Sequence, residues 1–193
     1  PEILGSVRTS DVRVCTLMLG ANDHCSVGEQ AVPLEEFAAN MSQLVEALRA
    51  ALPPECHLLL ISPGRINKEK WSAHIDQATG GRVDGSSRGA APALEQYAKA
   101  ALQVASAHRV QSLNLMHDMR YKLADYHAAE HPDGYHWSAK VNRFVYKQVR
   151  EKLEEVGLSP VQMAPHRPSA IAEALPFGND GDGRLARRAA RPR

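Results

Sequence analysis

The chain has 193 residues, a length that fits one domain. Hydrophobic residues make up 44% of the chain and charged residues 23%, which excludes a disordered chain and a membrane protein in bulk composition. Basic residues number 23 and acidic residues 22, so the net charge of +1 gives no indication of a nucleic-acid partner, and we expect none. No apolar run approaches the roughly 20 residues that cross a bilayer, so we expect no membrane span.

The cysteine content indicates the redox environment. Cys15, Cys25 and Cys56 are odd in number and form no Cys-x-x-Cys pair. Such cysteines are typical of reduced thiols rather than of a disulfide scaffold. We therefore predict a cytoplasmic location.

Three short apolar segments predict the strands of a buried sheet. Residues 12–19 are rich in β-branched side chains and stop at a glycine, and residues 57–61 stop at Ser-Pro-Gly. Residues 110–115 form the third segment. Continuous apolar runs of this kind suit strands that are buried on both faces.

Helical periodicity occupies the intervals between these strands. Apolar residues recurring at three and four predict amphipathic helices over 33–52 and 93–108, with a shorter helix over 68–75. The last helix is expected to begin at an N-capping Ser138 and to end at Gly157. Strands alternating with helices predict an α/β fold, with a parallel sheet between two helical layers.

The end of the chain has a different composition. Residues 158–193 are rich in proline, glycine and arginine and show no periodicity, which predicts a disordered tail. Its arginines could contact RNA or acidic lipid, but no aromatic residues are interleaved with them, so a solvated tail is the preferred interpretation. We therefore assign residues 1–157 to the folded domain.

Two segments with chemical potential fall where parallel sheets place their active sites, beyond the carboxyl ends of strands. Gly20 and Asn22 directly follow the first strand, and Asp133 and His136 lie just before the last helix. A carboxylate three residues before a histidine can hold the imidazole in one tautomer and leave its other nitrogen as a base. An asparagine amide can donate to a developing oxyanion. Each pair is also a common turn, but their joint placement favours a catalytic site.

Four linked segments carry a resemblance to a known family. They are GANDHCSVGEQAVPLEEFAANM, HLLLISPGRINKEKW, EQYAKAALQVA and HPDGYHWSAKVNRFVYKQV. In this order and spacing the chain resembles the SGNH (GDSL-type) hydrolases, in the branch of isoamyl acetate-hydrolysing esterases. The resemblance implies a three-layer α/β/α sandwich with a parallel five-stranded sheet, no cofactor, and a small-molecule ester as substrate.

The resemblance also implies roles for the four site residues. Asn22 matches the asparagine of the Gly-x-Asn-Asp block, an oxyanion donor, and Gly20 matches the glycine that lets it approach closely. His136 matches the general base of the Asp-x-x-His block, and Asp133 matches the carboxylate that orients it. We expect no metal site. The family pattern does not specify acyl or alcohol preference, or an oligomeric state.

One part of the family pattern has no counterpart. The nucleophilic serine belongs to a Gly-Asp-Ser motif after the first strand of the fold, and no such motif occurs in these 193 residues. The second-block glycine and the first two strands are also missing. We therefore expect the chain to be an N-terminally truncated esterase that is inactive alone. The alternative is a non-catalytic fragment or binding protein that keeps the sheet without a nucleophile.

Two other motifs and three aromatic residues have competing interpretations. Residues 85–89 read Gly-x-Ser-x-Gly, but a loop and not a strand precedes Ser87, which argues against a nucleophile elbow. Residues 127–131 read His-x-x-Glu-His, but Pro132 pushes the second histidine out of a helical conformation, which argues against a zinc site. Trp71, Trp137 and Tyr135 are interpreted as packing residues, with a place beside the acyl pocket as the alternative for Trp137 and Tyr135.

Overall fold

The computed structural model describes residues 9–24, 31–80, 91–123 and 132–158. Internal contacts divide the chain into two units, residues 1–156 and 157–193. The described residues belong almost entirely to the first unit. The disordered tail predicted for residues 158–193 stays a prediction, because all but its first residue lie outside the described part.

Three strands form one parallel sheet in the order β1-β2-β3. They are β1 (Val14–Leu17), β2 (His57–Ile61) and β3 (Gln111–Leu113). Along β2, the consecutive residues 59, 60 and 61 are each at most 5% exposed, so both faces of this central strand are buried. The continuous apolar run had predicted this burial.

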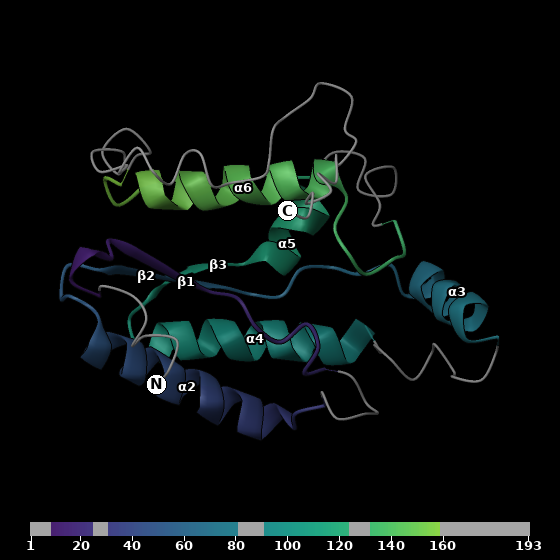
Figure 1. Ribbon diagram of the computed structural model, residues 1–193, viewed down its shortest axis with the longest axis horizontal. Helices are drawn as coiled ribbons and strands as arrows, with labels where there is room; N and C mark the ends of the chain where they lie inside the picture. Colours follow the sequence, from purple (N-terminus) through teal and green to yellow (C-terminus); the bar gives the residue numbers. More distant parts are fainter. Residues whose placement is uncertain (1–8, 25–30, 81–90, 124–131, 159–193) are drawn as a thin grey trace, which may run out of the picture. The chain divides into compact units, whose positions relative to one another are not determined.

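Helices cover both faces of the sheet (Figure 1). On one face lie α2 (Leu34–Ala51) and α4 (Ala91–Ala107), and on the other lie α5 (Leu115–Tyr121) and α6 (Ala139–Glu154). The remaining helix, α3 (Lys68–Thr79), lies beyond the carboxyl end of β2. A three-residue 3-10 helix, η1, precedes β1. The predicted α/β/α sandwich with a parallel sheet is confirmed.

The core between the sheet and the α2–α4 layer is built from the periodic apolar positions. Its buried members include Phe37, Met41, Val45, Leu60, Tyr97, Ala101 and Ala105. Each large side chain in such a core stabilises the fold by about 1.5–3 kcal/mol relative to an exposed one. The predicted apolar stripe of α2 is only partly buried, since Leu44 is 40% exposed.

Two predicted strands are too long. The first strand runs over Val14–Leu17 instead of 12–19, and the third over Gln111–Leu113 instead of 110–115. The third strand is cut short because the side chain of Asn114 accepts a hydrogen bond from the backbone N–H of His117, at 3.0 Å. This N-cap starts α5, a short helix that was not predicted, and Leu115 is its first residue.

The predicted ends of the other helices are close to the observed ones. Helix α3 continues to Thr79, beyond the predicted residue 75, and stops at Gly80 in a left-handed conformation. Ser138 caps α6 as predicted, accepting a hydrogen bond from the N–H of Val141 at 3.3 Å. Gly157, which has a φ of 77°, follows shortly after α6 ends.

Two observations concern the thiols and the membrane. Cys15 and Cys56 are free thiols, and Cys25 lies outside the described residues. Within the described ranges, no helix has the length and apolar character needed to cross a bilayer.

Candidate active site

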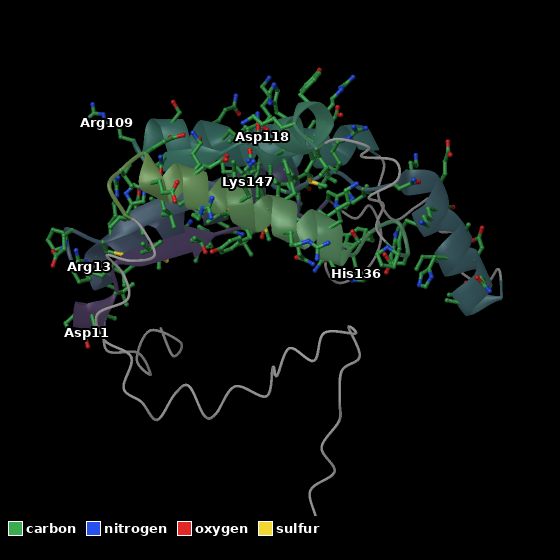
Figure 2. All side chains as sticks on the ribbon, turned by 90° about the horizontal axis from the view of Figure 1, so that it is seen from above. Asp11, Arg13, Arg109, Asp118, His136 and Lys147 are labelled. Carbon is green, nitrogen blue, oxygen red and sulfur yellow. The ribbon has the colours of Figure 1, made fainter. Side chains whose placement is uncertain are left out.

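The candidate site lies at the carboxyl edge of the sheet. In Figure 2, His136 lies at the opposite end of the molecule from Asp11 and Arg13, which precede β1. The segment from Gly20 to His24 follows β1, and the loop from Asp133 to Ser138 leads into α6. The fold therefore places both predicted segments at the end of the sheet where parallel sheets bind ligands.

Gly20 makes a sharp, tightly packed turn after β1. Its φ is +104°, and a Cβ atom there would lie 3.1 Å from the ring of Phe37. Its backbone N–H donates to Oδ2 of Asp23 at 3.0 Å. The turn leaves Asn22 exposed to solvent. The N–H of Gly20 is bound by Asp23, so the role of Gly20 is to allow the turn itself. Only glycine readily adopts such a φ where a Cβ atom would have so little space.

Asp133 organises the second loop. Its Oδ1 accepts hydrogen bonds from the backbone N–H groups of Tyr135, at 2.8 Å, and His136, at 2.7 Å. Its Oδ2 accepts a hydrogen bond from Nδ1 of His136 at 2.5 Å. One carboxylate thus closes the turn and holds the imidazole that the turn carries.

These contacts also determine the charge of the pair. Partial burial raises the pKa of Asp133, but the hydrogen bonds from the His136 ring and from two backbone N–H groups outweigh it and hold the pKa well below its usual range. The Asp133 side chain is 16% exposed and that of His136 is 75% exposed. An ionised carboxylate on Nδ1 fixes the tautomer in which Nε2 is the basic nitrogen, and stabilises the imidazolium when it forms.

Gly134 anchors this loop to the start of α3. Its carbonyl accepts a hydrogen bond from the N–H of Asn67 at 2.7 Å, and its φ is +91°. A Cβ atom at this position would lie 2.4 Å from the backbone nitrogen of Trp71 and 2.6 Å from the carbonyl oxygen of Asn67. The loop that carries Asp133 and His136 is therefore seated directly on the backbone of α3.

Tyr135 joins the two segments. Its hydroxyl donates to the carbonyl oxygen of Ala21 and lies 3.3 Å from Oδ1 of Asn22. Its ring packs against Trp71, with ring centroids 4.9 Å apart, and it neighbours His136 in the loop. The structure thus brings the predicted oxyanion donor and the predicted base together through Tyr135, for which the sequence had indicated packing or a place beside the acyl pocket but not this contact.

His24 packs against the turn that follows β1. Its side chain is buried at 3% exposure, and its Nδ1 donates to the carbonyl oxygen of Ala21. Burial lowers the pKa of His24, and the hydrogen bond to Ala21 and the charge of Asp23 oppose this only in part. The buried imidazole of His24 is therefore neutral, and it stabilises the turn through its hydrogen bond to Ala21.

A mainly apolar cavity of about 310 Å³ opens beside His136. Its volume lies at the small end of the range for small-molecule sites, about 300–1,000 Å³. Trp137 lines it, in agreement with the alternative interpretation of this residue, and Trp71 packs on Tyr135. Other lining residues include Met18, Leu19, Ala21, Pro63, Ile66, Leu94 and the aromatic Tyr135.

Several of these site residues were predicted to have another position, or had no predicted contact. Met18 and Leu19 were predicted to be strand residues, but they lie past the end of β1 and are 43% and 42% exposed beside the cavity. The Asp-Gly pair at 133–134 did signal a glycine with positive φ. Nothing in the local sequence signals that Tyr135 reaches Ala21, because that contact joins residues 114 positions apart.

The competing motifs lie outside the described part of the chain. Residues 85–89, which read Gly-x-Ser-x-Gly, residues 127–131, which read His-x-x-Glu-His, and the arginine-rich tail all belong to segments that the structure does not describe. Among the residues that it does describe, no three histidine, cysteine or acidic side chains are grouped so that they could hold a metal ion.

Comparison with known sequences identifies relatives over most of the chain. The sequence model of the GDSL-like lipase/acylhydrolase family matches residues 1–144. The isoamyl acetate-hydrolyzing esterase 1 homolog of Bos taurus is 34% identical over 184 residues, which cover 92% of this chain and 71% of the relative. The human homolog is 29% identical over 191 residues, which cover 94% of this chain and 73% of the relative.

Comparison with solved structures identifies the same fold. A lipase/acylhydrolase from Enterococcus faecalis superimposes with a TM-score of 0.54 at 15% identity, over 74% of this chain. A catalytic mutant of Axe2, an acetylxylan esterase from Geobacillus stearothermophilus, gives 0.55 at 18% identity, also over 74%. The chain spans 62% and 60% of the lengths of these two structures, less than two thirds of either.

Proposed function

This chain belongs to the GDSL-like lipase/acylhydrolase family, within the SGNH hydrolases and similar to isoamyl acetate-hydrolysing esterases, and we propose that it carries the base and oxyanion parts of a short-chain carboxylic ester hydrolase. The observation that carries this proposal is the Asp133–His136 pair, joined at 2.5 Å beside a small apolar cavity. An apolar cavity of this volume suits a short alkyl or acyl group.

In the proposed reaction, His136 acts as a proton shuttle. Nε2 of His136 takes the proton of a serine hydroxyl as the serine attacks the ester carbonyl, and Asp133 stabilises the imidazolium. The Asn22 amide donates to the oxyanion, a contact whose loss can cost about 10²–10³ in rate. The imidazolium then gives its proton to the leaving alcohol. Water, deprotonated by His136, finally releases the acid and regenerates the serine, so no cofactor takes part.

The nucleophile is proposed to come from outside these 193 residues. Ser62 and Ser138 lie near the carboxyl edge of the sheet and have structural roles. Ser62, at the end of β2, is fully buried and accepts a hydrogen bond from the N–H of Met116 at 3.3 Å. Ser138 caps α6. No Gly-Asp-Ser motif occurs in the sequence. This chain alone is therefore proposed to lack esterase turnover. A cytoplasmic location is proposed separately, because Cys15 and Cys56 are free thiols.

The proposal is tested by supplying the serine and removing the base. A segment of a GDSL-family esterase that carries the Gly-Asp-Ser serine is fused to this chain, and hydrolysis of p-nitrophenyl acetate is measured. We expect His136→Ala to abolish the activity of the fusion. His117→Ala is the matched control, because His117 is also exposed and its Nδ1 also contacts an aspartate, Asp118, at 3.2 Å. Equal effects of the two substitutions would contradict the proposed role of His136, and a fusion without any hydrolysis would favour a binding protein without turnover.

A further inference from the structure

We propose that Tyr135 is a positioning residue: its hydroxyl group, bound to the Ala21 carbonyl, sets the orientation of Asn22 relative to His136. The proposal rests on the proposed role of Asn22 as an oxyanion donor. It requires that Tyr135 be fixed at both ends, and that the group it binds control Asn22.

The backbone of Tyr135 is fixed within the His136 loop. Its N–H donates to Oδ1 of Asp133 at 2.8 Å, and the same oxygen accepts the N–H of His136 at 2.7 Å. The preceding residue, Gly134, accepts a hydrogen bond from the N–H of Asn67 at 2.7 Å. The Cα atom of Tyr135 is therefore tied to the carboxylate that orients His136.

The ring of Tyr135 is held between two aromatic neighbours. Trp71 of α3 packs against it with centroids 4.9 Å apart and planes inclined at 40°. His24, from the turn after β1, stacks on it at 6.3 Å with planes only 15° apart. Aromatic pairs at these separations are favourable and restrict rotation of the ring. The position of the Tyr135 hydroxyl, outside the His136 loop, is thus fixed by these ring contacts.

The hydroxyl contacts the peptide group that precedes Asn22. The carbonyl oxygen of Ala21 accepts hydrogen bonds from the Tyr135 hydroxyl and from Nδ1 of His24. A carbonyl oxygen has two lone pairs, so the two donors saturate it and fix the plane of the Ala21–Asn22 peptide. Oδ1 of Asn22 lies only 3.3 Å from the same hydroxyl. The single proton of the phenol is donated to Ala21, and Oδ1 of Asn22 lies close enough to share it, so one hydroxyl contacts both the peptide before Asn22 and its side chain.

The experiment compares Tyr135→Phe with a matched control in the 193-residue chain, using ¹⁵N-labelled protein. Phenylalanine keeps the ring contacts with Trp71 and His24 and removes only the hydroxyl. The control is Tyr146→Phe, because Tyr146 lies on α6 and is 63% exposed. We expect Tyr135→Phe to shift the backbone and side-chain amide signals of Asn22, and Tyr146→Phe to leave them unchanged. Unchanged Asn22 signals in Tyr135→Phe would overturn the proposal.

A second measurement needs no substitution. In the wild-type chain, the ring protons of Tyr135 beside its hydroxyl are expected to show nuclear Overhauser contacts to the protons of Ala21 and Asn22. The absence of these contacts would also overturn the proposal, even if Tyr135→Phe did not fold.

The catalytic consequence is measured separately, in the fusion that carries the serine. Loss of one neutral hydrogen bond that orients a donor is expected to lower kcat about 3–10-fold. KM is expected to stay constant, because the hydroxyl is already bound to the Ala21 carbonyl and its loss removes no donor intended for the substrate. If no variant of the fusion hydrolyses esters while Asn22 still responds to Tyr135→Phe, the hydrolase proposal fails and the positioning contact stands. A raised KM with unchanged kcat would contradict positioning.

Discussion

Substitution of Gly134 by alanine tests how the His136 loop is seated on α3. Gly134 has a φ of +91°, which costs an L-residue about 1–2 kcal/mol. The added Cβ would also lie 2.4 Å from the nitrogen of Trp71 and 2.6 Å from the oxygen of Asn67. Both are backbone atoms, one in α3 and one in its N-cap residue, so they cannot move aside as a side-chain tip would. Overpacking of this kind costs about 1–3 kcal/mol more.

Gly80→Ala is the control that separates the two terms. Gly80 ends α3 with a φ of +61°, and a Cβ atom there would meet nothing within 4 Å. Gly80→Ala should therefore be destabilised only by the positive φ, without an overpacking term. The expected difference between the two variants is the overpacking term, about 1–3 kcal/mol, or about 2–12 °C in Tm for a protein of this size.

The assay is thermal unfolding of the wild type and both variants, followed by circular dichroism at neutral pH. We expect Gly134→Ala to melt several degrees below Gly80→Ala. Equal losses of Tm in the two variants would refute the reasoning, because they would show that the loop has room to move away from α3.

Three further substitutions test other parts of the account. Asp133→Asn should lower the free energy of unfolding by about 1.5–3 kcal/mol at neutral pH, because the charge-assisted hydrogen bond to His136 is lost. The pKa of Asp133 is lowered in the folded state, so this stability difference is fully present above the unfolded pKa of about 3.9. It should disappear as the pH falls through the folded pKa. The pKa of His24 is also lowered, so unfolding favours its protonation, and stability should fall as pH drops below about 6.5. His24→Gln should flatten the curve of Tm against pH between 7.5 and 5.5, and a curve parallel to that of the wild type would argue against a buried neutral histidine. Ser138→Ala should remove the N-cap of α6 and cost about 1 kcal/mol in urea unfolding, whereas an unchanged midpoint would show that the cap is dispensable.

The elements of the fold could be predicted where one physical signal dominates. Residues 57–61 are apolar without interruption because both faces of β2 are buried, and the strand has the predicted bounds. Helix α6 begins at a serine cap, as predicted, and buries Val141, Val145 and Leu153. Helix α5 escaped prediction because it is short and begins within an apolar run, where only the capping role of Asn114 marks the change.

The candidate site was predicted in part for a similar reason. Asp133 and His136 are three residues apart, so a local pattern records their contact. The hydroxyl of Tyr135 reaches Ala21, and the cavity is assembled from residues that follow β1 and β2 and lie on α4 and the loop before α6. These are tertiary contacts, and no local periodicity encodes them.

The most direct test of the central claim is covalent labelling with a fluorophosphonate, followed by mapping of the adduct by mass spectrometry. The chain alone and the serine-bearing fusion are treated side by side, each with and without His136→Ala. The account predicts no adduct on the chain alone, and in the fusion a single adduct on the supplied serine that disappears with His136→Ala. An adduct on a serine within these 193 residues, such as Ser87, that depends on His136 would contradict the account and identify a nucleophile that the chain itself provides.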